Sequence, residues 1–331
     1  MCSSDLLLPV GIVAGCTQSE ADAGSATNPE SALLLSMDLA MGLTSGNANG
    51  TMSTPSDYDD NWALALAVDQ KDVDIVGVVV TMGNGSLGPQ MAVAQRSLDQ
   101  LEIDLPLVPG APSWLPIVPP QDHSGEDLTT TYVNEGVAFM ADVLRKRNDV
   151  TIVATGPLTD IACLALSFPD EAANITEVIA LIGSAPDGLS FAGKPVRDFN
   201  FSMDPRALAV IVEETTIPFV AVTFEASSST TISTDVVDAL ADGASPTARY
   251  FGRASQDYAA WWESIFGPTK PIWDASAVWR YLHPEDFTCE AARFEFKLGA
   301  PNLGSTETHD WVIPDPLSDG RIQACTSYID Q

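Results

Sequence analysis

Acidic side chains gather at three places in the chain where they could hold a cation or accept a proton. Asp38 follows the apolar run ALLLSM, the segment Asp57-Tyr58-Asp59-Asp60 precedes an apolar helical stretch, and Asp274 opens the run ASAVWRYL. A carboxylate before a helix is commonly only an N-cap, and that explanation suffices for Asp60 or Asp274 alone. One cap needs one carboxylate, however, and like charges this close are costly unless a cation neutralises them.

The ligand types narrow the choice of cation. The three histidines, His123, His283 and His309, are far apart in the sequence, and no CxxC motif or Cys/His pair has zinc spacing. Carboxylates and backbone carbonyls without His or Cys suit a hard ion, Ca²⁺ before Mg²⁺. The sequence therefore predicts a calcium site made of oxygen ligands.

Apolar runs alternate with helical patterns and must position these carboxylates. The runs are continuous and β-branched, which is typical of strands covered on both faces. We expect strands over Ala32–Met37, Val73–Met82, Leu105–Val108, Val150–Thr155, Val178–Ile182 and Ile217–Phe224. We expect helices over Asn61–Asp69, Gln90–Leu101, Asn134–Lys146, Leu158–Leu166 and Pro205–Glu214. This alternation predicts an α/β fold, a doubly wound, mostly parallel sheet flanked by helices, with ligands at the carboxyl ends of the strands.

Composition excludes several classes of protein. The chain has 331 residues, with 15 Lys+Arg against 45 Asp+Glu, for a formal charge of −30. Such acidity argues against binding a nucleic-acid polymer, because phosphate contacts need clustered basic residues. A hydrophobic content of 45% excludes a disordered chain.

The first residues resemble an export signal. Leu6–Ala14 is apolar but too short to span a bilayer, and the ending Val13-Ala14-Gly15-Cys16 resembles a bacterial lipobox. Met1–Asp5 lacks the usual positive charge and reads like a translated adapter, which suggests that the true start was replaced. An ordinary apolar N-terminus is the alternative. We expect a signal segment at 1–16, a flexible linker at 17–31 and a single domain at 32–331, exported as a lipoprotein anchored at Cys16.

The remaining cysteines agree with export. Cys163 lies in an apolar helical run and reads as a core residue. Cys289 and Cys325 remain available for a disulfide in an oxidising compartment, and the sequence leaves that pairing open.

Beyond these features, a series of motifs from about Ala32 onward resembles the nucleoside hydrolase family, the inosine–uridine-type ribohydrolases, in the same order. The motifs are SMDLAMG (36–42), DYDDNWALAL (57–66), VVTMGNG (79–85), TIVATGPLTD (151–160), LIGSA (181–185), DFNFSMDP (198–205) and Trp273-Asp274. The resemblance implies a nucleoside hydrolase-like open sheet of the Rossmann type. It also implies a small-molecule nucleoside substrate.

The resemblance assigns roles to individual residues. It implies a Ca²⁺ ion held by the side chains of Asp38, Asp60 and Asp274 and by the backbone carbonyl of Thr155. It implies that Asp59 is the general base on a bound water. It implies substrate contacts from Asn84, Asp198, Asn200 and Trp273, with Asn84 supporting the water and metal network.

The chain also departs from the family pattern. Ser36 stands where the family has a first Asp, and the polar insertion Leu43–Ser56 replaces a short turn. Asp198 is one methylene shorter than the usual Glu, and an expected Asn is absent near Ala192-Gly193. These changes predict altered sugar contacts or weaker activity.

Trp273 stands where many family members carry a His that is thought to protonate the leaving base. The Trp-Asp pair resembles the purine-specific branch, and stacking on a purine is worth about 1–3 kcal/mol. For the other nearby aromatic residues we expect core packing rather than a second wall of the base site; they are Trp114, Tyr258, Trp261 and Trp262.

The first functional hypothesis is calcium-dependent hydrolysis of the N-glycosidic bond of ribonucleosides, preferably purine ones, to free base and ribose. The alternative is a non-catalytic nucleoside- or ribose-binding lipoprotein of the same fold. A third hypothesis is hydrolysis of another N-riboside, such as a nicotinamide riboside. The sequence leaves open whether the protein forms a homo-oligomer.

Overall fold

The computed structural model describes residues 31–46, 53–115, 132–186, 188–297 and 309–328. The predicted signal segment with Cys16, and the predicted linker up to residue 30, lie outside these ranges, so export and lipidation stay predictions. Within these ranges, none of the helices combines the length and apolar character that a bilayer crossing requires.

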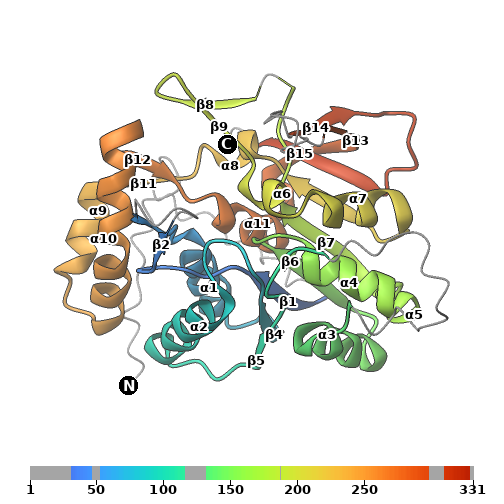
Figure 1. The fold of residues 1–331 in the computed structure, drawn as a ribbon, viewed down its shortest axis with the longest axis horizontal. Coiled ribbons are helices and arrows are strands. Elements are labelled where there is room, and N and C mark those ends of the chain that lie inside the picture. Colours follow the sequence, from blue (N-terminus) through green and yellow to red (C-terminus); the bar gives the residue numbers. More distant parts are fainter. Residues whose placement is uncertain (1–30, 47–52, 116–131, 187, 298–308, 329–331) are drawn as a thin grey trace, which may run out of the picture.

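A nine-stranded sheet forms the centre of the fold (Figure 1). Its strands are β1 (Ala32–Met37), β4 (Ile75–Val80), β5 (Leu107–Pro109), β6 (Val150–Ala154), β7 (Ile175–Leu181), β10 (Phe219–Val222), β13 (Phe287–Lys297), β14 (His309–Pro314) and β15 (Ile322–Tyr328). Their spatial order is β14-β13-β15-β10-β7-β6-β1-β4-β5. The strands from β15 to β5 in this order run parallel, whereas β13 is antiparallel to both β14 and β15. The predicted doubly wound, mostly parallel α/β sheet is confirmed.

The sheet changes its direction of growth between β1 and β6. From β1 the chain builds outward through β4 to β5, then returns to β6 and builds the other way through β7 to β10. Ligands of doubly wound sheets bind outside the carboxyl ends of the strands at such a point. Asp38 and Thr155 directly follow the two strands that flank it.

Alternate residues of β1 enter two different hydrophobic layers. Leu34 packs with α3 (Glu135–Lys146), α4 (Thr159–Ser167) and α7 (Pro205–Glu214). Leu33 and Leu35 pack with the helices on the opposite face, which are α1 (Asp59–Asp69), α2 (Leu87–Leu101) and α11 (Trp273–Leu282). Because both faces are covered, the strand is apolar at every position except Ser36, as the sequence predicts.

A third hydrophobic cluster holds a helical pair at one side of the molecule (Figure 1). The pair is α9 (Thr234–Ala241) and α10 (Pro246–Phe266), and the two-stranded antiparallel sheet of β11 (Thr231–Ser233) and β12 (Thr269–Pro271) lies beside it. The remaining short elements are β2 (Thr44–Gly46), β3 (Ser53–Pro55), α5 (Pro169–Ala172), β8 (Leu189–Phe191), β9 (Lys194–Val196), α6 (Phe199–Met203), α8 (Phe224–Ser227) and a 3₁₀ turn at Pro284–Asp286.

Two sequence questions are answered by this fold. The described ends of the insertion Leu43–Ser56 pair as β2 and β3, and residues 47–52 lie outside the described ranges. A disulfide joins Cys289 on β13 to Cys325 on β15, and Cys163 is buried as a free thiol.

Candidate active site

Asp38 and Thr155 meet at the switch point of the sheet. The backbone N–H of Thr155 donates to the carbonyl oxygen of Ser36, the residue two places before Asp38, at 2.9 Å. Both side chains are buried. The strand ends therefore bring together two of the predicted ligand residues from sequence positions more than one hundred residues apart.

Two helices begin at the same edge, and both carry carboxylates in their first turn. Asp59 and Asp60 open α1, Asp274 lies in the first turn of α11, and neither helix has a side-chain N-cap. One carboxylate oxygen from each of these three buried residues lies within 4.8 Å of the other two. The positive helix ends offset part of this negative charge. A cation would offset the rest.

Asp38 is tied to this carboxylate group through Asp60. Asp60 Oδ1 accepts from the backbone N–H of Asp38 at 3.2 Å and from Thr155 Oγ1 at 2.6 Å. Asn84 donates its backbone N–H to Asp38 Oδ2 at 2.7 Å and its side-chain amide to Asp60 Oδ2 at 3.4 Å. Asp38 lies outside the three-residue group, whereas Asp59, the predicted base, lies inside it.

The predicted sugar contacts are partly occupied by the protein itself. Asp198 caps α6, because its Oδ1 accepts from the Phe201 N–H at 2.8 Å and its Oδ2 from the Gly183 N–H at 2.7 Å. The Asn200 amide donates to the carbonyl oxygens of Thr155 and Leu181 at 2.7 and 3.1 Å. Any ribose hydroxyl on Asp198 must therefore share an oxygen with a backbone donor.

Asp310 is a neighbour of Asp198 that the sequence reasoning missed. It is buried on β14, and burial together with the nearby Asp198 raises its pKa well above the ordinary value. Burial likewise raises the pKa of Asp198, although bonds from Asp310 and from backbone N–H groups oppose the shift. The pair therefore favours a proton held on Asp310. No motif flanks Asp310 that would have marked it.

Trp273 lies in an aromatic cluster and is only 7% exposed. Its ring meets Phe191, Phe224 and Trp262 edge to face, with centroids 5.4–6.1 Å apart. Its indole N–H is buried without a hydrogen-bond partner among the described residues. Trp262 is buried and Tyr258 and Trp261 pack against a core cluster, as expected, but Trp114 is 62% exposed, so the expectation of core packing is wrong for that residue.

Lys270 is the main residue that the sequence reasoning missed. Its ammonium lies 3.0 Å from Asp57 Oδ1 and 3.0 Å from Asp59 Oδ2, and its side chain is 2% exposed. It also stands 4.5 Å from the centroid of the Trp273 ring, a contact worth about 2 kcal/mol when desolvated. The available signal was a single basic residue four places before Asp274 in a chain with few lysines and arginines.

Four carboxyl groups at the site, those of Asp38, Asp57, Asp60 and Asp274, hold protons more tightly than ordinary carboxyls do. Burial and the neighbouring Asp60 raise the pKa of Asp38 well above its usual value, and burial with Asp59 and Asp60 does the same for Asp274. Burial raises the pKa of Asp60, and burial with Asp59 raises the pKa of Asp57 to about 7. Burial alone would lower the pKa of Lys270, but Asp57 and Asp59 raise it, so the lysine is charged.

These residues fit a hard divalent ion. The donor set consists of oxygen atoms, and Asp38 Oδ1 is buried with no hydrogen-bond partner in the described part of the chain. The raised pKa values have the same cause, since buried negative charge in this volume lacks sufficient compensation. Asp38, Asp59, Asp60 and Asp274 are the side chains that could hold the ion.

Two glycines of the sequence motifs are packed against Asp38. A Cβ atom on Gly83 would stand 1.8 Å from Asp38 Oδ2, and one on Gly156 would stand 3.1 Å from Asp38 Cβ. Only residues without a side chain fit at these positions. The Gly-Asn and Thr-Gly motifs therefore let the backbone approach the Asp38 carboxylate closely, in addition to supplying polar groups.

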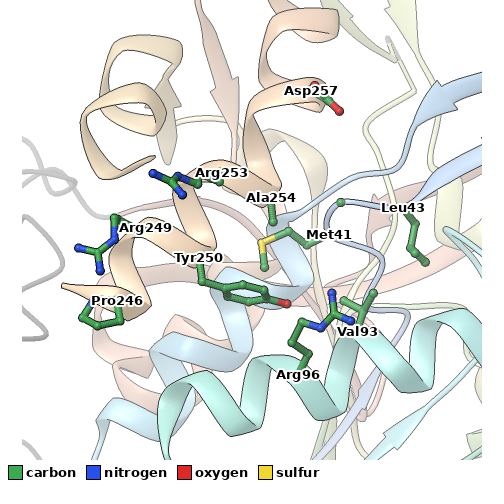
Figure 2. Close-up of a pocket in the computed structure, with 11 residues that line it drawn as sticks. Met41, Leu43, Val93, Arg96, Pro246, Arg249, Tyr250, Arg253, Ala254 and Asp257 are labelled. Carbon is green, nitrogen blue, oxygen red and sulfur yellow. The ribbon is translucent and has the colours of Figure 1, made fainter. Parts of the chain in front are cut away.

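A separate cavity of about 550 Å³ lies between α2 and α10 (Figure 2). Arg96, Arg249 and Arg253 contribute to its lining, and none of the clustered carboxylates does. Arg249 and Arg253 also donate to backbone carbonyls at the end of α9 and just after it, at 2.8 Å to Gly243 and 3.2 Å to Ala241. These two arginines therefore support the helical pair.

The chain is similar in sequence to known proteins. Residues 55–322 match the family model described as inosine-uridine preferring nucleoside hydrolase. The chain is 24% identical over 264 residues to the pyrimidine-specific ribonucleoside hydrolase RihB of Escherichia coli O1:K1 / APEC, covering 75% of this chain and 83% of that protein.

Solved structures share the fold. The plant nucleoside hydrolase PpNRh1 matches with a TM-score of 0.69 at 17% identity, covering 91% of this chain and 95% of that one. The purine-preferring ribonucleoside hydrolase from Gardnerella vaginalis matches with a TM-score of 0.68 at 16% identity, covering 89% and 93%.

Replacing Gly83 by alanine tests the packing around Asp38. The new Cβ displaces the Asp38 carboxylate, and we expect calcium affinity to fall by about 10–100-fold in calorimetric titration. Gly88→Ala is the matched control, because a Cβ there has no heavy atom within 4 Å. Equal calcium affinity in the two variants would contradict the role of Asp38.

The raised pKa values predict how the metal-free protein responds to pH. Asp38, Asp60 and Asp274 keep their protons in the fold to higher pH than in the unfolded chain, where Asp titrates near ~3.9. The folded state therefore binds more protons above that pH, and its stability falls as the pH rises above about 4. Thermal unfolding of chelator-treated protein should show this fall, and the stabilisation by added calcium should grow over the same range. A calcium effect that is constant from pH 5 to 8 would refute the prediction.

Proposed function

The chain belongs to the inosine-uridine preferring nucleoside hydrolase family, and on that premise we propose that it is a calcium-dependent, purine-preferring ribonucleoside hydrolase. The reaction breaks the bond between C1′ of ribose and the base nitrogen and forms a bond from C1′ to a water oxygen. One observation carries the proposal. Three buried carboxylates from two helix N-termini converge within 4.8 Å beside the switch point of the sheet.

Carboxylates suit this reaction because positive charge develops on the sugar. The transition state of glycoside cleavage resembles an oxocarbenium ion, and fixed negative groups around it lower its energy. Asp59 is the proposed general base, which accepts a proton from the attacking water. The bond electrons leave with the base nitrogen.

The oxygen-only donor set supports calcium as the ion. A bound divalent ion lowers the pKa of a water ligand and orients vicinal hydroxyls. Asp38, Asp60 and Asp274 are its proposed side-chain ligands, and the Thr155 carbonyl is the proposed backbone ligand. That carbonyl already accepts from the Asn200 amide, and its second lone pair remains for the ion.

The sugar contacts are proposed to come from Asn84, Asp198 and Asn200. Asn84 and Asn200 each bond a proposed ligand of the ion, Asp60 and Thr155 respectively, so both side chains are held in place. Asp198 is fixed as the cap of α6. Because Asp198 is one methylene shorter than the family's Glu, its carboxylate lies closer to the backbone than a glutamate carboxylate would.

Purine preference is the finer part of the proposal, and Trp273 supports it. One face of its ring is covered by Lys270 and the ring is only 7% exposed, so stacking of a purine requires the aromatic cluster to open on the opposite face. The relatives include pyrimidine-specific and purine-preferring enzymes, so the preferred nucleobase has to be measured directly.

The Asp59→Asn variant, assayed at saturating calcium, tests whether Asp59 is the general base. The amide cannot accept the proton, and we expect kcat for ribose release to fall by about 10²–10⁴-fold. Asp72→Asn makes the same change at an exposed position and should leave kcat unaltered. Turnover of the Asp59 variant near that of the control would reject Asp59 as the base.

A nucleoside panel tests the activity itself. Ribose release from inosine, guanosine, adenosine, uridine, cytidine and nicotinamide riboside is measured with and without a calcium chelator. We expect purine nucleosides to be hydrolysed fastest, and the chelator to abolish release until calcium is restored. Tight inosine binding without ribose release from any substrate would favour the non-catalytic binding protein instead. Faster release from nicotinamide riboside would favour the third hypothesis.

A further inference from the structure

The three donors of the Lys270 ammonium all have acceptors within the protein. They are Asp57 Oδ1 at 3.0 Å, Asp59 Oδ2 at 3.0 Å and the carbonyl oxygen of Pro271 at 2.7 Å. An ammonium group has three N–H bonds and accepts none. No donor of Lys270 is left for a substrate, so the lysine acts on the carboxylates.

Aromatic rings enclose the same ammonium. The ring centroids of Trp273, Tyr58, Tyr258 and Trp262 lie 4.5, 5.0, 5.6 and 5.9 Å from Lys270 Nζ. Rings exclude water and leave the charge in a medium of low dielectric, where its attraction to Asp57 and Asp59 is strong. The strand pairing of β12 with β11 fixes the backbone from which the lysine projects.

Asp57 completes the arrangement and contacts the same lysine. Its carboxylate accepts from the backbone N–H of Tyr58 at 2.7 Å and also bonds the side chain of Tyr258. Asp57 and Asp59 therefore share the ammonium, and their two carboxyl groups also contact each other. The lysine contacts Oδ2 of Asp59, and Oδ1 is the oxygen that takes the proton in the proposed reaction.

Lys270 also supplies charge that a divalent ion alone does not. Five buried or nearly buried carboxylates surround the site, namely Asp38, Asp57, Asp59, Asp60 and Asp274. In the described part of the chain, the salt bridges to these five come from Lys270 alone. Buried carboxylates without partners are strongly destabilising, so the lysine compensates the cluster even before an ion binds.

We propose that Lys270 is a positioning residue, a built-in cation that fixes the Asp59 carboxylate in its reactive orientation and holds the acidic cluster together without the metal ion. The proposal rests on the proposed function in taking Asp59 as the base. The proposal assigns two opposite effects to the lysine charge, and they can be measured separately. Its charge orients Asp59, which favours turnover, and the same charge repels a nearby cation, which weakens calcium binding.

The test replaces Lys270 by methionine, which keeps length and apolar stem but removes the charge. At saturating calcium we expect kcat to fall by about 10²-fold, the effect of misplacing a reacting group, with KM changed less than about threefold. In an Asp59→Asn background the same replacement should change kcat less than about twofold, because the lysine acts through Asp59. Lys194→Met is the control. That exposed lysine also lies over an aromatic ring, Phe266 at 5.9 Å, and has no salt bridge within the described residues.

Two measurements without substrate accompany the kinetics. Metal-free Lys270→Met should unfold at a lower temperature than metal-free wild type, and calorimetry should show calcium affinity equal to or higher than that of wild type. If Lys270 only supported the fold, Lys270→Met would weaken calcium binding and would lower kcat equally in the wild-type and Asp59→Asn backgrounds. Either result overturns the proposal. If Lys270→Met does not fold, Lys270→Arg is used, because its planar fork keeps the charge but not the three-way geometry. Unchanged kcat in that variant would equally overturn the proposal.

The outcomes also separate this proposal from the proposed function. Wild-type protein that releases no ribose from any nucleoside refutes the function. If the wild-type protein is active and Lys270→Met lowers kcat by the same factor with and without Asp59→Asn, only the positioning role is refuted.

Discussion

Burial of like charge is the constraint on which this structure depends. Several carboxylates lie at one edge of the sheet with almost no access to water. Their raised pKa values reflect the free-energy cost of burying their charges together. The fold offsets that cost with two helix N-termini, a buried lysine and hydrogen bonds from Asn84 and Thr155. A bound cation would compensate the remaining deficit, as we propose for this site. In that proposal, metal affinity and the lower stability of the metal-free protein have one origin.

Topology explains why residues so far apart in sequence converge. The switch between β1 and β6 brings two strand ends side by side, and α1 and α11 start near them. Glycines at 83 and 156 allow the loops after β4 and β6 to approach Asp38 closely. Each motif along the chain therefore contributes either a ligand group or the space that a ligand group needs.

The sequence predicted those parts of the molecule whose determinants are local. Continuous apolar runs identified β1 and its parallel neighbours, and the motif order located Asp38, Asp59, Asp60 and Asp274 at one edge. Lys270 could not be assigned in this way, because its role depends on carboxylates and rings from distant segments. The function of Asp198 as the cap of α6 depends on where the backbone of Gly183 lies. The sequence analysis missed β13, β14 and β15, because exposed positions interrupt their apolar residues, unlike the buried runs of the other parallel strands.

The disulfide has a consequence that reaches beyond the edge of the sheet. Cys289 and Cys325 join β13 to β15, and β14, which pairs with β13, carries the Asp310 side chain that bonds Asp198. The disulfide therefore covalently braces the strands behind Asp198, the carboxylate that we propose as a sugar contact. The redox chemistry of the protein's surroundings is thereby coupled to how firmly those strands are held.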